Sequence, residues 1–376
     1  MPVMTGLSGN EMFCLGLKGY APGEIVIGNS VHSLGFLGGI GAGLQAAFGG
    51  EVSQVTNLVT EGRHESQNRL MREVGQHGAD GVTGVTSELR TMQGNIEFLS
   101  VGSCIKAETG TRPATPFSTS TDGQGLYCLL DAGYAPKSFV MGNVAYSVGI
   151  AGGLFGSLKS LARGEIKEFS DIFNHTRHLA LDRITAEART AGGNAVVGIE
   201  TRVLPFQGTH EMLMIGTAAH HPSLQTGSAN TIVTSDLTCE EMWNLAALGY
   251  MPQKLVLGTA VYSMGLIGGL MASFKSIVKG EVSELTSLIY EAREHAIGLI
   301  RDEAAAIGAD DVVGIKIRIH DIGGLIEFMA IGTAVKKTSG AKPLTAQLPP
   351  QAIIRDRDTW ISDDNIFAQA LSASRE

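Results

Sequence analysis

The sequence predicts an α+β fold repeated three times along the chain, each copy a two-layer β-α-β-β domain with one long helix packed on an antiparallel sheet. Two observations predict it. A unit of about 85 residues recurs at offsets of 114 and 116 residues, with no gap inside a unit, and such recurrence indicates tandem domains. Inside each unit, a segment with the apolar period of a helix is flanked by strand-like segments. The predicted domains are residues 12–106, 126–219 and 241–336, followed by a tail at 337–376.

The alignment of the copies depends on residue types that recur at matching places. Among them are the sets Gly28, Gly142 and Gly258; Glu51, Glu165 and Glu281; Arg63, Arg177 and Arg293; and Glu97, Glu211 and Glu327. The segments between the units, 107–125 and 220–238, are rich in Ser, Thr, Gly and Pro, which is typical of linkers. Such a linker spans about 25 Å as a coil and up to about 60 Å extended, enough to hold successive domains apart.

Each unit begins with a short apolar stretch that ends in G-Y-x-P, followed by an extended run that predicts a strand, at 25–33, 139–147 and 255–263. A Gly-rich segment comes next. A helical pattern then starts at the recurring Gly-Glu dipeptide. It is clearest in the third copy, where the apolar stripe consists of Val282, Leu285, Ile289, Ala292, Ala296 and Leu299. Gly308 is the expected C-terminal cap of this helix.

Two strands are predicted to complete each unit. In the third copy, Val313, Ile315, Ile317 and Ile319 alternate with Lys316 and Arg318. This period of two indicates a sheet with one wet face. The last strand, 326–335, is apolar on both faces apart from Glu327, which indicates a central strand covered from both sides.

Composition argues against several classes of function. The 376 residues contain 28 basic and 37 acidic side chains, a formal charge of −9, which opposes unspecific binding to nucleic acid or anionic membranes. The four cysteines, at 14, 104, 128 and 239, show no C-x-x-C spacing and are predicted to be buried free thiols. The N-terminal sequence lacks the features of a signal peptide. We therefore expect a cytoplasmic protein.

The β-α-β-β order resembles the YbjQ-like family when it is combined with two motifs. These are G-x-N-A-V-V-G-I at 192–199 and I-G-T-A at 215–218 and 331–334. The resemblance covers all three units, about 255 residues, and the first copy departs most from the pattern, at 81–84 and 101–104. Members of the family carry a heavy-metal-binding description. The resemblance implies small two-layer domains joined in rings of five.

Recurring charged residues are the first candidate site. Arg63, Arg177 and Arg293 stand beside the apolar stripe of each helix, and Glu97, Glu211 and Glu327 stand in the covered strand. A lone buried carboxylate is costly. We therefore predict that each glutamate pairs with an arginine, within the unit or across a domain interface. An acid–base role beside an activating arginine is the alternative, but no nucleophile recurs near them, so no catalytic residue is predicted.

A second candidate site lies on the helix of the second copy. Asp171, His175, His178 and Asp182 share one helix face and offer mixed nitrogen and oxygen ligands for Zn²⁺ or Ni²⁺. A partner subunit would have to complete such a site, because four ligands along about 16 Å of helix cannot reach one ion. A solvated polar face gives the same pattern. No other cofactor is predicted.

The Gly-rich segments at 35–50, 149–160 and 265–276 lack the G-K-[ST] ending of a phosphate-binding loop. Their glycine content is poor for a lipid-facing helix, so burial between subunits is the favoured use, rather than membrane insertion. The C-terminal tail carries Trp360, Ile366 and Phe367 among charges. It is either a docking helix for a cargo protein or a neighbouring chain, or a disordered tail.

The function predicted from these features is a non-enzymatic, self-assembling scaffold that forms a ring, stack or shell. The alternative is a protein that binds a metal or small ligand between its domains. Five chains in three stacked rings, or a larger closed shell, would satisfy closed symmetry together with the fivefold rings that the family resemblance implies.

Overall fold

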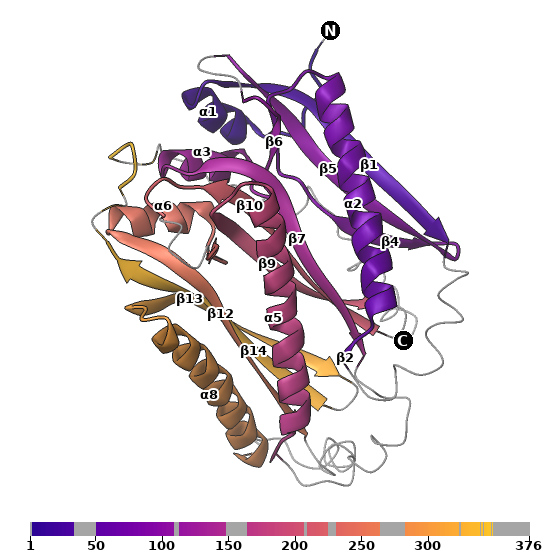
Figure 1. The fold of residues 1–376 in the computed structure, drawn as a ribbon, viewed down its shortest axis with the longest axis vertical. Coiled ribbons are helices and arrows are strands. Elements are labelled where there is room, and N and C mark those ends of the chain that lie inside the picture. Colours follow the sequence, from indigo (N-terminus) through magenta and orange to yellow (C-terminus); the bar gives the residue numbers. More distant parts are fainter. Residues whose placement is uncertain are drawn as a thin grey trace, which may run out of the picture. The chain divides into compact units, whose positions relative to one another are not determined.

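The computed structural model describes residues 2–33, 50–108, 113–147, 164–206, 209–224, 231–263, 283–322, 325–338 and 342–346, with single residues at 340 and 348 (Figure 1). These residues confirm the α+β fold and its three copies, which together form one compact unit, Met1–Ala346. The Gly-rich segments lie almost wholly outside the described residues. The tail residues Trp360, Ile366 and Phe367 also lie outside them.

Each repeat contains a short helix, a long strand, a long helix and a closing antiparallel set of strands in that order, and the repeats differ in their short strands. The first has α1 (Gly9–Leu17), β1 (Tyr20–Ser33), β2 (Gly50–Glu51), α2 (Ser53–Gln76), β3 (Gly81–Thr83), β4 (Glu88–Met92) and β5 (Asn95–Ala107). The second has β6 (Phe117–Ser118), α3 (Gly123–Asp131), β7 (Ala135–Ser147), β8 (Gly164–Glu165), α5 (Lys167–Thr190), β9 (Ala195–Phe206) and β10 (Thr209–His220). The third has β11 (Val233–Thr234), α6 (Cys239–Ala247), β12 (Tyr250–Ser263), α8 (Ser283–Ala306), β13 (Asp311–Ile322) and β14 (Leu325–Lys337).

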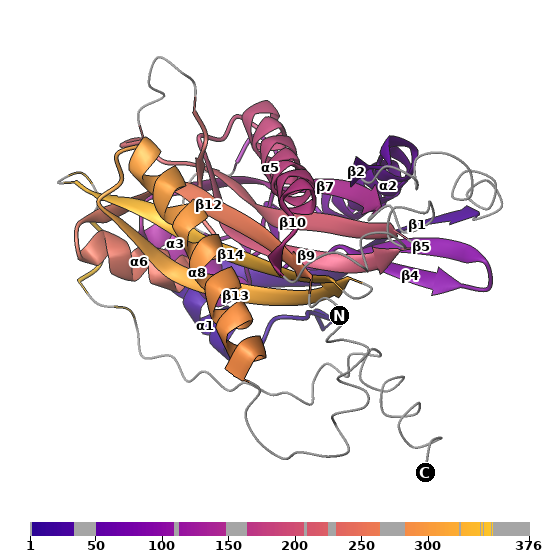
Figure 2. The ribbon, with the colours of Figure 1, turned by 90° about the horizontal axis from the view of Figure 1, so that it is seen from below.

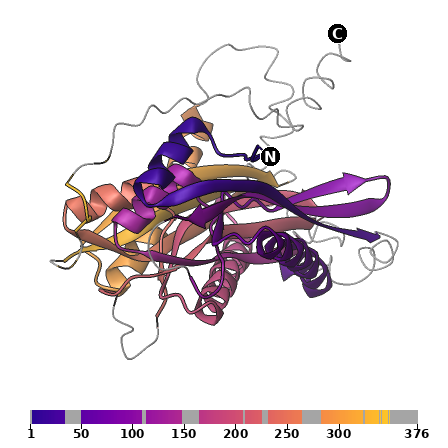
Figure 3. The same ribbon diagram turned by 90° about the horizontal axis from the view of Figure 1, so that it is seen from above.

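The short apolar stretches before G-Y-x-P form helices that the sequence analysis did not predict. Ser8, Asp122 and Thr238 cap their N-termini with a side-chain oxygen, which satisfies backbone donors that have no partner inside the helix. The helices α1, α3 and α6 contact one another in sequence and lie together at one end of the sheets (Figure 3). The long helices end before glycines with positive φ, and Gly308 (φ 67°) is the C-terminal residue predicted for the third.

In each repeat the last strand is the central strand of an antiparallel sheet, in the orders β1-β5-β3, β7-β10-β9 and β12-β14-β13, and β4 pairs with β5 as well. One long helix packs on each sheet, and Figure 2 shows α8 lying across β12, β14 and β13. Gly142, in the middle of β7, permits this close packing. A Cβ atom there would collide with the backbone of Ala180 and Ile184 in α5.

The long helices of the first two repeats, α2 and α5, each pack against the sheet of their own repeat and also against the sheet of the next repeat. Phe139 and Met141 of β7 join the core that Val26 and Leu70 form around α2. In the same way, β12 residues join the core around α5. Sheets and helices therefore alternate along this compact unit, and α2 and α5 lie between sheets of successive repeats (Figure 1).

Successive repeats also exchange short strands. The prediction that the Gly-Glu dipeptides open the helices is wrong in the first two repeats, where they form β2 and β8 and pair with β7 and β12 of the following repeat. The third dipeptide, at 280–281, lies outside the described residues. The segments between repeats contain β6 and β11, which pair in parallel with β3 and β9 of the preceding repeat. The prediction that these segments hold successive domains apart, in different rings, is therefore wrong. The three repeats pack directly against one another.

The exposure of β13 also differs from the expectation of a wet Lys/Arg face. Ile315, Ile317 and Ile319 are 47%, 38% and 49% exposed. Their counterparts in the second repeat include Ile199 and Thr201, which are each only 3% exposed. The difference arises because the third sheet covers the second repeat, whereas no described segment covers this part of the third repeat.

Two further sequence inferences concern cysteines and membranes. The four cysteines are free and buried, as predicted. Burial raises the pKa of Cys104 to about 11 and that of Cys239 to about 12, so these thiols stay protonated and unreactive at neutral pH. Among the described helices, none combines the length and the apolar character that crossing a lipid bilayer requires.

Candidate functional site: the junctions between repeats

Arg63 of α2 reaches across the first junction to the second repeat. Its Nε donates to Oε1 of Glu211 at 3.0 Å, and its Nη2 donates to Oε2 at 2.7 Å. Its Nη1 donates to the carbonyl and hydroxyl oxygens of Ser87 at 3.2 and 3.0 Å. Both side chains are buried. This two-pronged geometry is the one that fixes an arginine and a carboxylate most strongly.

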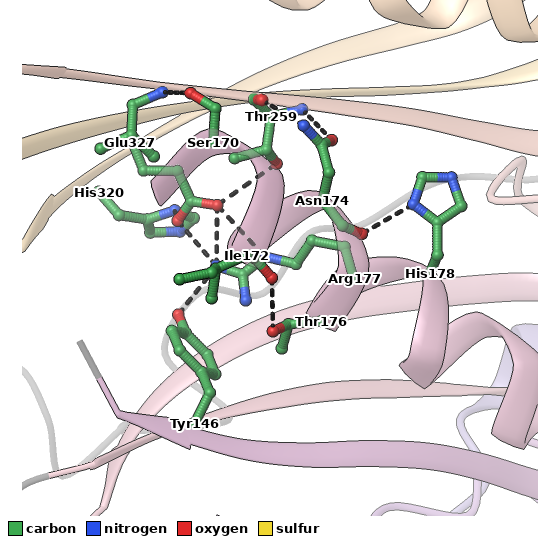
Figure 4. A network of polar contacts seen from close by, with 11 residues as sticks. Tyr146, Ser170, Ile172, Asn174, Thr176, Arg177, His178, Thr259, His320 and Glu327 are labelled. Carbon is green, nitrogen blue, oxygen red and sulfur yellow. Dashed lines mark hydrogen bonds and ion pairs between the residues drawn. The ribbon is translucent and has the colours of Figure 1, made fainter. Parts of the chain in front are cut away.

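Arg177 of α5 makes the same contact across the second junction (Figure 4). Its Nη2 lies 2.8 Å from both carboxylate oxygens of Glu327 and donates to the hydroxyl of Tyr146 at 2.8 Å. His320 contacts the same carboxylate at 3.1 Å. The Nη1 atom of Arg177 has no partner among the described residues. The junction is therefore a buried polar network rather than a single pair.

Electrostatics keep the second pair ionised. Burial by itself opposes the charge of Glu327, but the Arg177 charge and the hydrogen bond from His320 outweigh it and lower the pKa of this carboxyl. For Arg177, burial favours loss of the proton, and the Glu327 charge outweighs that effect and raises its pKa. Removing either partner would leave the other charge buried without compensation.

The third recurring pair is not brought together. Arg293 lies exposed on α8 and has no ion-pair partner among the residues that the structure describes. Glu97 lies half-buried in β5, 3.4 Å from the amide nitrogen of Asn29. The structure thus places Arg63 with Glu211 and Arg177 with Glu327, across junctions between repeats. Arg293, in the third repeat, and Glu97, in the first repeat, stay unpaired with each other at opposite ends of the three repeats.

The helix face predicted to bind a metal takes part in the second junction at one residue. His178 places Nδ1 2.8 Å from the Asn174 carbonyl oxygen and Nε2 3.4 Å from Glu303. Asp171, His175 and Asp182 are exposed. No group of three side chains able to hold a metal occurs in the described parts of the chain. The metal site on this face stays a prediction.

Asp131 is a junction residue that the sequence analysis missed. This buried carboxylate accepts hydrogen bonds from Lys18 of the first repeat at 2.5 Å, from Trp243 of the third at 2.7 Å, and from the Thr345 hydroxyl at 2.7 Å. Burial opposes its charge, but these donors lower its pKa. The matching positions in the other repeats are Leu17 and Ala247, so recurrence could not reveal it.

Comparison with known proteins assigns the family. A family profile described as "Putative heavy-metal-binding" matches residues 20–108, 134–221 and 250–338. The chain belongs to this YbjQ family. It is similar to the "Encapsulin nanocompartment protein Rv1762c" of Mycobacterium tuberculosis, with 31% identity over 248 residues, which is 61% of this chain and 89% of that protein.

Shorter relatives match single repeats of this YbjQ-family chain. A UPF0145 protein of Saccharolobus islandicus is 36% identical over 109 residues, 29% of this chain and 91% of that protein. A UPF0145 protein of Vibrio campbellii is 45% identical over 83 residues, 22% of this chain and 80% of that protein. Each of these proteins is therefore about the length of one repeat.

We expect the first junction to weaken as pH rises. The hydrogen bond between His64 and Glu187 (2.6 Å) outweighs burial and raises the pKa of His64. Its stabilisation is complete below the unfolded pKa, near 6.5, and is lost as pH rises through the raised folded value. Because His64 is 40% exposed, His64→Gln should cost only about 0.5 kcal/mol at pH 5.5 and almost nothing at pH 9. Urea unfolding at both pH values measures this, and a cost independent of pH would contradict it.

Proposed function

We propose that this YbjQ-family chain is a non-enzymatic structural protein that associates with copies of itself to build a scaffold such as a ring, stack or shell. One observation carries the proposal. Sixteen large apolar side chains are exposed in the described residues, and none lies between residues 93 and 247, the range that contains the second repeat. The second repeat has a neighbour on each side. The first and third repeats each expose the apolar surface that such a neighbour would cover.

Two further observations support this function. The recurring arginines and glutamates of the inner junctions hold repeats together, which is a structural use of charges that a catalytic site would keep accessible. The M. tuberculosis relative is named as an encapsulin nanocompartment protein, which favours a shell role for this chain. The tail with Trp360, Ile366 and Phe367 remains a predicted docking segment for a cargo.

Native mass spectrometry together with light scattering tests the proposal on the full chain. We expect a closed oligomer at micromolar concentration that dissociates on dilution or at high denaturant, because apolar surface on the end repeats would be buried in it. If the chain stays monomeric from micromolar concentration up to about 100 times that concentration, self-assembly is contradicted. The measured number of chains also tests the fivefold geometry implied by the family resemblance.

Binding of a small ligand between repeats is the second candidate function. It is favoured by a cavity of about 390 Å³ lined by residues from both the second and third repeats. Glu200, Cys239 and Lys316 are among the side chains that line it. A retained ligand would appear in the same native mass spectrum as a mass excess lost on denaturation.

For metal, we expect less than about one equivalent of transition metal per chain in protein purified without a histidine tag, and we expect the fold to survive chelator. The reason is that the inner junctions are stabilised by ion pairs and apolar packing, whereas metal-dependent folds lose their structure with the ion. Elemental analysis and circular dichroism check this. Stoichiometric metal that disappears in His175→Ala and His178→Ala would support metal binding instead.

A further inference from the structure

We propose that the third repeat of one chain docks on the first repeat of a second copy of this chain, and that this contact reproduces the two inner junctions, with Arg293 of one copy paired to Glu97 of the other. This inference rests on the proposed function and names its partner and its surfaces. Three independent features of the described residues support it. They are a sheet face, a helix face and a strand edge.

The sheet face is the outer side of β1 and β5. In β1, Ile25, Ile27 and Val31 are 41%, 52% and 60% exposed. Their counterparts in β7 are Phe139, Met141 and Ala145, which are at most 2% exposed because α2 covers them. Counterparts in β12 are equally buried under α5. The outer face of β1 is thus built like the other two and lacks only a helix from a preceding repeat.

The helix face is the side of α8 that points away from β12. At the inner junctions, the matching faces of α2 and α5 carry a buried arginine and, three residues earlier, a polar side chain that bonds the next sheet. Thr60 donates to Asn143, and Asn174 bonds the backbone of Thr259. In α8 the same two places are Tyr290, which is 66% exposed, and Arg293, which is also exposed. This face therefore matches the open sheet, with Arg293 in the place opposite Glu97.

The strand edges are also complementary. The N-terminal segment has the geometry of the segments before the other repeats: the Gly6 amide donates to Ser103 as the Ser120 amide donates to Thr217. In those other segments, β6 and β11 pair in parallel with β3 and β9 of the preceding repeat. The residues that correspond to β6 are Val3 and Met4, and both are exposed. In the chain whose third repeat docks on this segment, β13 offers the matching edge, at Asp311 and Val312.

The charges around this contact differ from those at the inner junctions. At the inner junctions a histidine directly after the arginine contacts a glutamate of the next helix, in the pairs His64–Glu187 and His178–Glu303. In α8 this place is Glu294, and the corresponding glutamate of the first repeat is Glu73. Glu24 also stands where the third repeat has Lys254, which contacts Glu303. Like charges would therefore meet here, and the contact between copies should be weaker than the inner junctions.

The two ends cannot satisfy each other within one chain. Figure 1 shows β1 and α8 at opposite ends of the alternating sheets and helices. The surfaces are different from each other, so the contact between copies is heterologous and generates a ring if its rotation closes. Continuity with two junctions already formed in the chain identifies the occupant as a second copy.

A charge exchange tests the contact. Arg293→Glu and Glu97→Arg should each weaken association of the full chain at least about tenfold, because each places like charges opposite one another. An equimolar mixture of the two variants should associate again, since each junction between unlike variants pairs opposite charges. Both positions are accessible in the single chain, so the variants should keep the wild-type circular dichroism spectrum. Arg189→Glu, at an exposed position of α5, is the matched control and should leave association unchanged.

A second test of the contact is a substitution that should increase the affinity between copies. Glu294→His restores the residue type of the inner junctions opposite Glu73 and should lower the Kd between copies about two- to fivefold near pH 6. Sedimentation velocity measures all variants. If the wild-type chain is monomeric, both this contact and the proposed function are wrong. If the wild type associates but both charge reversals associate equally well, or their mixture gains nothing over either alone, the contact is wrong and self-assembly stands.

Discussion

Arg177→Met should lower the free energy of unfolding by about 3–5 kcal/mol, because it leaves the Glu327 carboxylate buried without its cation. Glu327 has no exposed surface and accepts from Arg177 through both oxygens. His320 and Thr259 also contact this carboxylate, but neither carries the fixed charge of a guanidinium. The loss should therefore be far larger than that of a surface ion pair.

A double-mutant cycle separates the pair from the rest of the junction. Arg177→Met combined with Glu327→Leu should recover much of the loss, since an apolar pair of similar volume needs no compensation. Arg202→Met, which breaks the exposed contact with Glu200, is the matched control and should cost under about 1 kcal/mol. Fluorescence of the buried Trp243 in a Trp360→Phe background reports unfolding. A coupling energy near zero between Arg177 and Glu327 would show that the two charges act independently.

Recurrence in the sequence identified the charged residues of the junctions but could not decide which ones meet. The spacing of arginine and glutamate is the same in every unit, so pairing inside a unit and pairing with the next unit fit the pattern equally. The structure shows Glu327 with Arg177 of the preceding repeat, and not with Arg293 of its own. Only the packing of α5 between two sheets distinguishes the alternatives.

The sequence predicted which residues of a strand share a face, but it did not predict which face is exposed to solvent. The alternation in β13 separates the isoleucines from Lys316 and Arg318, yet the isoleucines are as exposed as Lys316. Identical periods occur in β9, where the neighbouring repeat buries the corresponding residues. A pattern along one strand says which residues share a face, whereas the next domain in space decides whether that face is wet.

Asp131 and the short exchanged strands were missed for a related reason. Asp131 occurs in one repeat only, and its three hydrogen-bond donors are distant in the sequence. The strands β6 and β11 contain two residues each, too few to give a period. Both features depend on contacts between repeats, which local sequence patterns do not record.

Gly142→Ala should destabilise the protein by about 3 kcal/mol, the upper end of what overpacking costs. The added Cβ would meet the Ala180 carbonyl oxygen and the Ile184 nitrogen, which are backbone atoms of α5 and cannot move aside by a rotamer change. The helix itself would have to shift away from β7. Because β12 lies against the other side of α5, that shift would compress the next junction, and a displacement that begins inside one repeat would spread to two.

Two other glycines provide graded controls for this argument. At Gly258 a Cβ would meet Leu299 Cβ at 2.5 Å and the Ala296 carbonyl oxygen at 2.8 Å, so Gly258→Ala should cost less than Gly142→Ala. In α8, Gly298 has no atom within 4 Å of the added Cβ, and Gly298→Ala should stabilise the protein by about 0.5–1 kcal/mol through helix propensity. Urea unfolding gives the order of the three variants. Amide hydrogen exchange then locates the loss, which should fall in α5 and β12 of Gly142→Ala and leave β1 protected. Equal stability of Gly142→Ala and wild type would mean that α5 can withdraw from β7 freely, which is incompatible with a helix held between two sheets.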